Sequence, residues 1–81
     1  MVIRKTLELS TAHLSTHTAQ RMSLFSMVRH EFGWLVSVDT TGDTYPNDLH
    51  ACMVLAESNG CDYILFDSDV EPIEDLPTYD W

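Results

Sequence analysis

The chain has 81 residues, 44% of them hydrophobic, and a formal net charge of −9 at pH 7. This length suits one small domain with a modest core, and the hydrophobic content argues against wholesale disorder. No apolar run approaches the ~18 residues of a membrane span. Arg4 and Lys5 interrupt the apolar start, which excludes a signal-peptide core. We therefore expect a single domain over residues 1–81, located in the cytoplasm.

The charge is divided unevenly along the chain. All four basic residues lie in residues 1–30 beside one acidic residue, which gives +3. Residues 31–81 contain the other twelve acidic residues and no Lys or Arg, which gives −12. Such a field repels nucleic acids and anionic membranes and favours basic protein surfaces or cations. The sequence therefore predicts a protein partner with a basic surface and neither direct nucleic-acid binding nor membrane binding, although solubility alone would also explain the charge.

The first half of the chain predicts a strand, a helix and a second strand. Apolar and polar residues alternate over residues 2–9, as in a strand with one buried face. Over residues 15–31, apolar residues recur at spacings of three and four and predict a helix that packs on the sheet. These residues are Met22, Phe25, Val28 and Phe32, with Leu24 and Met27 at one edge. Gly33 is expected to end this helix in a left-handed turn, and the alternation over residues 34–39 predicts the second strand.

The second half predicts a turn, a helix, a strand and a tail. A turn centred on Gly42 is expected over residues 40–44. Pro46 suits a first helical position, and Asp48 places an acidic residue in the first turn of the helix. One face of this helix is expected to carry Leu49, Cys52, Met53 and Ala56, and the helix to stop at Asn59-Gly60. Residues 61–66 are apolar on both faces and predict a central strand. Residues 67–81 are acidic, contain two prolines and show neither period, so we expect an extended tail in which Ile73, Leu76, Tyr79 and Trp81 pack back on the domain.

This order of elements, β-α-β-α-β, predicts an α/β fold. The connections are long enough for parallel crossovers, so we expect a three-stranded, mostly parallel sheet that carries two helices and an acidic extended C-terminal tail. Polar outer faces on the first two strands place both helices on one side of the sheet. Because the third strand is apolar on both faces, the tail or a second copy of the chain is expected to cover the other side, and a homodimer is one prediction.

Two carboxylates follow the apolar strand in the segment Ile64-Leu-Phe-Asp67-Ser-Asp69. This segment resembles the strand on which haloacid-dehalogenase-like phosphatases present a nucleophile and an acid around magnesium. That family places the strand first, follows it with Gly-Thr and needs a downstream lysine. Here Val70-Glu71 follows and no Lys lies beyond position 5, so the phosphatase interpretation does not hold. Asp67 and Asp69 remain candidate ligands for Mg²⁺ or Ca²⁺. A solvated acidic loop is the alternative, and no cofactor is expected.

The segment Ser10-Thr11-Ala12-His13 follows the first strand, at the end of the sheet where open α/β folds bind ligands. Its hydroxyl groups and histidine could hold an anion or serve in acid–base chemistry beside Asp67. The candidate ligand-binding residues are Ser10, Thr11, His13 and Asp67. A helix N-cap flanked by surface histidines would explain the same residues. No residue is assigned as catalytic, and the sequence favours a protein that is not an enzyme.

Four motifs resemble those of a family of small bacterial proteins of unknown function. They are Leu9-Ser-Thr-Ala-His13-Leu, Gly33-Trp34-Leu-Val, Gly60-Cys-Asp-Tyr63-Ile-Leu-Phe-Asp67 and the closing Leu76-Pro77-Thr-Tyr79-Asp80-Trp81. The resemblance covers most of the chain and implies that the gene is carried on plasmids, prophages or integrated elements. It supplies no activity, and it marks Ser10, Thr11, His13, Asp67, Tyr79, Asp80 and Trp81 as motif positions.

These observations favour a small, acidic, non-enzymatic interaction protein. Its specific form is a mobile-element accessory that binds a basic surface of a host nucleic-acid-binding protein, as an inhibitor or DNA mimic. The candidate partner-binding residues are Asp69, Glu71, Glu74, Asp75, Tyr79, Asp80 and Trp81. The alternative is a small ligand- or metal-binding domain, or a hydrolase that uses Ser10 and His13 with Asp67 and Asp69.

Overall fold

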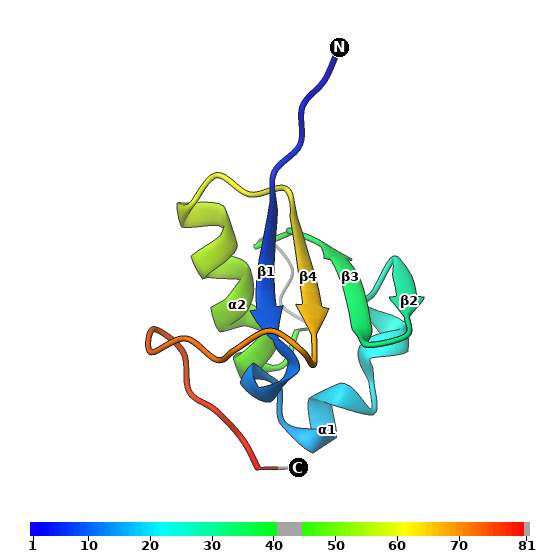
Figure 1. Cartoon of the computed structure of the whole chain (residues 1–81), viewed down its shortest axis with the longest axis vertical. Coiled ribbons are helices and arrows are strands. Elements are labelled where there is room, and N and C mark those ends of the chain that lie inside the picture. Colours follow the sequence, from blue (N-terminus) through cyan, green and yellow to red (C-terminus); the bar gives the residue numbers. More distant parts are fainter. Residues whose placement is uncertain (41–44, 81) are drawn as a thin grey trace.

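A computed structural model describes residues 1–40 and 45–80 of the chain (Figure 1). Its elements, in chain order, are β1 (Thr6–Ser10), the 3-10 helix η1 (Thr11–His13), α1 (Thr16–Ala19), the 3-10 helix η2 (Met22–Leu24), β2 (Val28–His30), β3 (Gly33–Ser37), α2 (Asn47–Ser58) and β4 (Tyr63–Asp67). The strands form one sheet in the order β1-β4-β3-β2. β1 runs parallel to β4, whereas β3 runs antiparallel to both of its neighbours.

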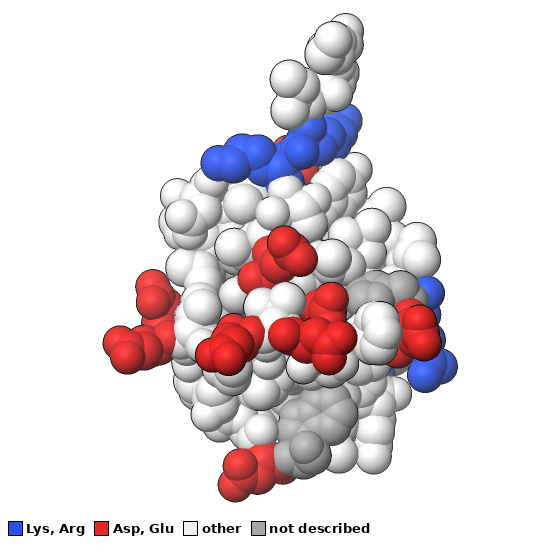
Figure 2. All heavy atoms as spheres, in the orientation of Figure 1, with Lys and Arg blue, Asp and Glu red and all other residues white. Residues whose placement is uncertain are grey.

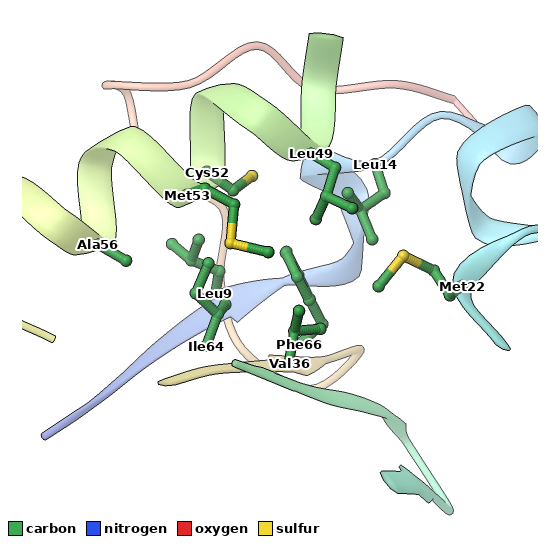
Figure 3. Packing of buried hydrophobic residues seen from close by; sticks show 10 residues of the cluster. All are labelled: Leu9, Leu14, Met22, Val36, Leu49, Cys52, Met53, Ala56, Ile64 and Phe66. Atoms are coloured by element: carbon green, nitrogen blue, oxygen red, sulfur yellow. The ribbon is translucent and has the colours of Figure 1, made fainter. Parts of the chain in front are cut away.

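The core lies between α2 and one face of the sheet. Side chains from α2 and from the strands point toward one another across this layer (Figure 3). The buried hydrophobic residues are Leu9, Leu14, Met22, Val36, Leu49, Cys52, Met53, Ala56, Ile64 and Phe66. The four residues predicted for the inner face of α2 are all among them, so this prediction is confirmed.

The local signals at the ends of α2 also correspond to the structure. Pro46 was predicted at the first helical position and is instead the N-cap, one residue before the helix begins at Asn47, with an extended backbone (ψ 152°). Asp48 lies in the first turn, as predicted. The helix ends at Ser58 with Asn59 as its C-cap, and Gly60 follows with a φ of 70°. This left-handed conformation carries no steric penalty for glycine, which explains the stop at this position.

The α/β class is confirmed, but the three-stranded, mostly parallel sheet is wrong. The sheet has four strands and is mixed, because residues 28–37 form a β-hairpin with a turn at residues 31–32. The hairpin contributes one strand in each direction. β3 is the one beside β4, and it pairs with β4 in the antiparallel sense.

The helix predicted over residues 15–31 is likewise wrong. Only Thr16–Ala19 is α-helical, followed by the single 3-10 turn η2. Met22 is buried and Phe25 packs on the core, but Val28 and Phe32 of the same predicted stripe are 54% and 46% exposed, so the spacing does not mark one buried helix face. The Met27 N–H donates to the Leu35 carbonyl at 2.8 Å, so this end of the predicted helix is hydrogen-bonded to β3 as part of the hairpin. Tertiary pairing overrides the helical period here.

Gly33 begins β3 and does not cap a helix, which corrects its predicted role. A Cβ atom at this position would lie 1.9 Å from the Phe66 carbonyl oxygen of β4. This approach is far closer than real Cβ contacts allow. Glycine is therefore required here by the pairing of β3 with β4.

The predicted strands differ from the observed ones mainly at their ends. β1 begins at Thr6 and not at residue 2, and Ile3, inside the predicted strand, is 82% exposed, so the predicted start of this strand is wrong. β3 and β4 lie within two residues of the predicted bounds. The turn predicted around Gly42 falls on residues 41–44, outside the described part of the chain. No helix in the described residues is both long and apolar enough to span a membrane.

After β4, residues 68–80 contain neither helix nor strand, as expected for the tail. The tail leaves the carboxyl end of β4 and crosses the carboxyl end of β1 (Figure 1). Ile73 and Leu76 are partly buried against the core cluster, so their predicted packing is confirmed. Tyr79 is 38% exposed, and Trp81 lies outside the described residues.

Candidate functional site

The sequence-predicted ligand residues gather at the carboxyl ends of β1 and β4. These strands are parallel, and Ser10 is paired with Asp67 in the register. The Ser10 Oγ accepts a hydrogen bond from the Ala12 N–H at 3.1 Å and so caps η1, which carries Thr11 and His13. The fold thus brings all four predicted residues to one end of the sheet.

His13 is a buried histidine whose two ring nitrogens both bind the main chain of the tail. Its side chain is 1% exposed. Nδ1 lies 2.8 Å from the Pro77 carbonyl oxygen, which can only accept, so Nδ1 carries the proton and donates. Nε2 accepts from the Ile73 N–H at 3.0 Å. In this arrangement His13 is neutral and holds the tail against η1, and neither nitrogen is available for proton transfer or for a metal.

The tail has a further main-chain bond to η1. The Tyr79 N–H donates to the Ala12 carbonyl at 2.9 Å. Together with the two bonds to His13, this contact fixes residues 73–79 at three points. The Ser-Thr-Ala-His segment is therefore the docking site of the tail in this fold.

The carboxylate of Asp67 also has a local structural partner. Its Oδ1 accepts from the Asp69 N–H at 2.8 Å, which closes a turn directly after β4. The other candidate metal ligand, Asp69, is exposed. Within residues 1–40 and 45–80, no three His, Cys, Asp or Glu side chains converge as a metal site would require. Asp67 and Asp69 remain a predicted pair of oxygen ligands without a third partner there.

Two adjacent hollows open at this end of the sheet and share Thr11 and Ser68. The larger, of about 320 Å³, is lined by Ser10, Thr11, Ala12, Ser68 and Tyr79. The other, of about 230 Å³, is lined by Thr11, Arg29, Glu31, Phe32, Gly33, Trp34 and Ser68. Sequence reasoning missed Arg29 and Glu31 because it placed them on or beside a helix. Ser68 could have been found from its place between Asp67 and Asp69.

Asp48 joins α2 to the segment that follows η1. Its carboxylate accepts from the Ser15 N–H at 2.8 Å, from the Thr18 hydroxyl at 2.7 Å and from the Leu49 N–H at 3.0 Å. Partial burial raises the pKa of Asp48, but the hydrogen bonds from Ser15, Thr18 and Leu49 together lower it more. The pKa of Asp48 therefore lies below its ordinary value, and the group is held ionised.

The two cysteines are free thiols. Burial, with a smaller contribution from the Asp48 carboxylate, raises the pKa of Cys52 to about 12. Since the thiolate is the nucleophilic form, Cys52 is an inert core residue at neutral pH.

Acidic side chains form a band across the face shown in Figure 2, over the lower ends of β1 and β4 and the tail beside them. Asp69, Glu71, Glu74, Asp75 and Asp80 of the tail are all exposed. Within the described residues, an ion pair joins Arg4 to Asp62 at 4.0 Å. No ion pair there involves any of the five tail carboxylates. The tail therefore presents unneutralised negative charge on a backbone that is held in place.

Comparison with known proteins gives a family and no activity. Neither the curated proteins nor the solved structures gave a match. Residues 6–81 match the C-terminal domain of a family of unknown function, DUF5983. Because this match spans nearly the whole chain, the protein belongs to the DUF5983 family, as the resemblance to a family of unknown function implied.

Proposed function

We propose that this domain is a non-enzymatic interaction module that binds a basic protein surface through its acidic segment, residues 67–80. The observation that carries the proposal is the set of exposed tail carboxylates that no Arg or Lys neutralises in the described part of the chain. Unneutralised charge of one sign attracts a surface of the opposite sign and speeds encounter with it.

The anchoring of the acidic segment by His13 supports this function. A free acidic tail would lose conformational entropy on binding, and that loss weakens association. Here Ile73, Pro77 and Tyr79 are already tied to η1 by main-chain hydrogen bonds. The carboxylates between and beside these points therefore lie on a backbone that is already ordered, so less conformational entropy is lost when the segment binds.

The specific form of the proposal is a mobile-element accessory that acts on a host nucleic-acid-binding protein. Proteins of that class carry basic surfaces that neutralise phosphates. A row of carboxylates can occupy such a surface in place of the phosphates, so the domain would inhibit its partner as a DNA mimic. The −12 charge of residues 31–81 fits this mode of binding.

The test starts from the tagged chain, used to capture partners from a host lysate for identification by mass spectrometry. Affinity for the purified partner is then measured for the wild type, for Glu74→Lys in the acidic segment and for Glu57→Lys on α2. Both glutamates are exposed, and the same substitution at each position changes the net charge by the same amount. We expect Glu74→Lys alone to weaken binding, by about tenfold, because it places like charge against the basic surface.

Salt and DNA supply the remaining arms of the test. Affinity should fall between low and physiological salt, because salt screens exposed charges. A duplex DNA that the partner binds should compete with the domain. Binding that ignores salt, or that Glu74→Lys leaves unchanged, would refute the electrostatic proposal, and the absence of competition would refute the DNA-mimic form.

A second candidate function is the binding of a small ligand or cation at the same end of the sheet. It is favoured by the two hollows that meet at Thr11 and Ser68. A hydrolase that uses Ser10 and His13 would first have to release the tail, since both His13 nitrogens are occupied. Titration with Mg²⁺ or Ca²⁺, followed by amide chemical shifts, tests the cation form, which requires saturable shifts at Asp67 and Asp69.

A further inference from the structure

Three segments of the chain meet at the end of the sheet where the two hollows open. Thr11 follows β1, Ser68 follows β4, and Phe32 precedes β3, which runs antiparallel to β4 (Figure 1). The Ser68 N–H donates to the Phe32 carbonyl at 2.9 Å and so joins the start of the tail to the turn of the hairpin. Thr11 and Ser68 line both hollows, which are here together called the recess.

The smaller hollow of the recess carries both signs of charge. Arg29 and Glu31 line it, and both are exposed. Within residues 1–40 and 45–80, neither side chain forms an ion pair or a hydrogen bond. A ligand that fills this hollow would displace water from both charges. Each charge then needs a partner on the ligand, because removing a charge from water without a partner is costly.

This requirement discriminates among classes of ligand. An anion would pair with Arg29 but leave Glu31 without a partner, and Asp67 and Asp69 on either side of Ser68 add to the negative field. A cation would pair with Glu31 but leave Arg29 without a partner. A neutral ligand supplies no opposite charge to either side chain. A ligand with one carboxylate and one ammonium group pairs with both, and the planar guanidinium of Arg29 suits a carboxylate in particular.

The other residues of the recess indicate the size and polarity of the ligand. Trp34, which packs partly against the core, adds an aromatic residue to the lining of the smaller hollow. The larger hollow is lined mainly by residues with hydroxyl groups, which are Ser10, Thr11, Ser68 and Tyr79. The volumes of about 230 and 320 Å³ are small beside the ~300–1,000 Å³ of pockets for drug-sized ligands, so the recess suits a ligand of amino-acid size.

We infer that the recess binds a free α-amino acid with a polar side chain. Its carboxylate pairs with Arg29, its ammonium group pairs with Glu31, and its side chain extends toward the hydroxyl groups of the larger hollow. This inference rests on the second candidate function, the binding of a small ligand at this end of the sheet, and names the class of that ligand. It does not depend on the binding of a basic protein, because Glu74, which tests that binding, lines neither hollow.

The experiment follows the amide chemical shifts of the chain while each standard amino acid with a polar side chain is added singly, to millimolar concentration. At least one should give saturable shifts at Thr11, Gly33 and Ser68. The N-acetyl form of the best binder lacks the ammonium group, and its amide form lacks the carboxylate. Each should bind about tenfold or more weakly than the free amino acid, since each leaves one charge of the recess without a partner.

Two variants show whether Arg29 and Glu31 make these contacts. Arg29→Gln and Glu31→Gln should each weaken binding of the free amino acid by about tenfold or more. The preference should also change, because Arg29→Gln should bind the amide form at least as well as the free amino acid, and Glu31→Gln should do so with the N-acetyl form. A purely structural role would not exchange these preferences. Arg21→Gln and Glu57→Gln are the controls, since both residues are exposed and line neither hollow, and they should leave the affinity unaltered.

The outcomes that contradict the inference differ from those that contradict the proposed functions. Absence of saturable shifts with every polar amino acid would overturn it. Saturable shifts with Mg²⁺ or Ca²⁺ and with no amino acid would overturn it while supporting a ligand site at this end of the sheet, as would equal affinity for the free and the blocked forms. Loss of partner binding in Glu74→Lys concerns the interaction module alone.

Discussion

At the scale of single residues, His13 shows how a motif that suggests chemistry can serve the fold. A histidine after a strand, near serine, threonine and aspartate, has the residue types of an acid–base site. In the structure its ring binds two main-chain groups of a segment 60 or more positions away. The same geometry explains why the Ser-Thr-Ala-His and Leu-Pro-x-Tyr-Asp-Trp motifs occur in one chain, because the first docks the second.

We predict that His13→Ala destabilises the domain by about 2–4 kcal/mol, since it leaves a cavity at a buried position and removes two hydrogen bonds to the main chain of the tail. The measurement is urea unfolding, and the control is His17→Ala, because His17 is exposed on α1. Amide exchange should accelerate at Ile73 and Tyr79 in the His13 variant. Unchanged exchange at those amides would show that His13 does not anchor the tail.

Asp48 makes tertiary hydrogen bonds that its position in the first turn of a helix did not indicate. Its place in the first turn of α2 favours a carboxylate through the helix dipole. The structure adds the Ser15 and Thr18 donors, which tie the start of α2 to α1. Most of what this carboxylate does is therefore a tertiary contact, invisible in the local sequence.

The lowered pKa of Asp48 predicts how stability depends on pH. Because the folded pKa lies below the unfolded one, this contribution to stability is present above about pH 5 and is lost as the pH falls through the folded pKa. Asp48→Asn should cost about 1–2 kcal/mol at neutral pH, allowing for partial exposure of the group. The difference from wild type should shrink as the pH is lowered, in urea unfolding series at several pH values. The control is Asp69→Asn, and a difference between wild type and Asp48→Asn that grows in acid would contradict the assignment.

At the scale of elements, the sequence predicts best where period and end signals coincide. α2 has a four-residue inner face, a proline at its start and Asn59-Gly60 at its end, and its bounds were predicted closely. β4 was identified because its run of apolar residues is bounded by turn residues. The gathering of Ser10, Thr11 and Asp67 at one sheet end followed from the expectation of parallel strands, and it holds because β1 and β4 are parallel.

The hairpin of β2 and β3 could not be predicted in this way. Met22, Phe25 and Val28 have helical spacing, yet the pairing of Met27 with Leu35 depends on a contact across the turn. Gly33 is consistent with either structure, as a helix stop or as a site of close approach. The need for glycine here comes from the Phe66 carbonyl of β4, which lies 33 positions away in the sequence. Helix and strand signals compete over this segment, and long-range pairing selects the strand.

Gly33 and Gly60 offer a matched test of two reasons for glycine. At Gly33, alanine would force β3 away from β4, so we predict a loss of about 3 kcal/mol or more. At Gly60 nothing lies within 4 Å of an added Cβ, and only the φ of 70° is unfavourable, so Gly60→Ala should cost about 1–2 kcal/mol. Urea unfolding of both variants measures the order. A smaller loss at Gly33 than at Gly60 would contradict the close approach.

At the scale of the whole molecule, the fold separates the charges that the sequence already separates. Arg4 and Lys5 lie at the amino end of β1, and the acidic segment crosses its carboxyl end. Figure 2 shows the acidic band between basic side chains above it and at one side. Because His13 anchors the tail, the carboxylates of this band stay close to one another, and their mutual repulsion destabilises the folded state.

That repulsion predicts that salt stabilises the domain. The radius of gyration is 11.7 Å, so at ~0.01 M salt, where the Debye length is about 30 Å, all the acidic groups repel one another. At ~0.15 M the Debye length is about 8 Å, and only neighbouring charges still interact. Urea unfolding is the suitable measurement, because urea adds no ions, and the free energy of unfolding should rise with NaCl. Glu74→Lys should reduce this dependence more than Glu57→Lys, since both change the net charge by two but only Glu74 lies among the tail carboxylates. Equal reductions would mean that the repulsion is spread over the whole surface and is not concentrated in the acidic segment.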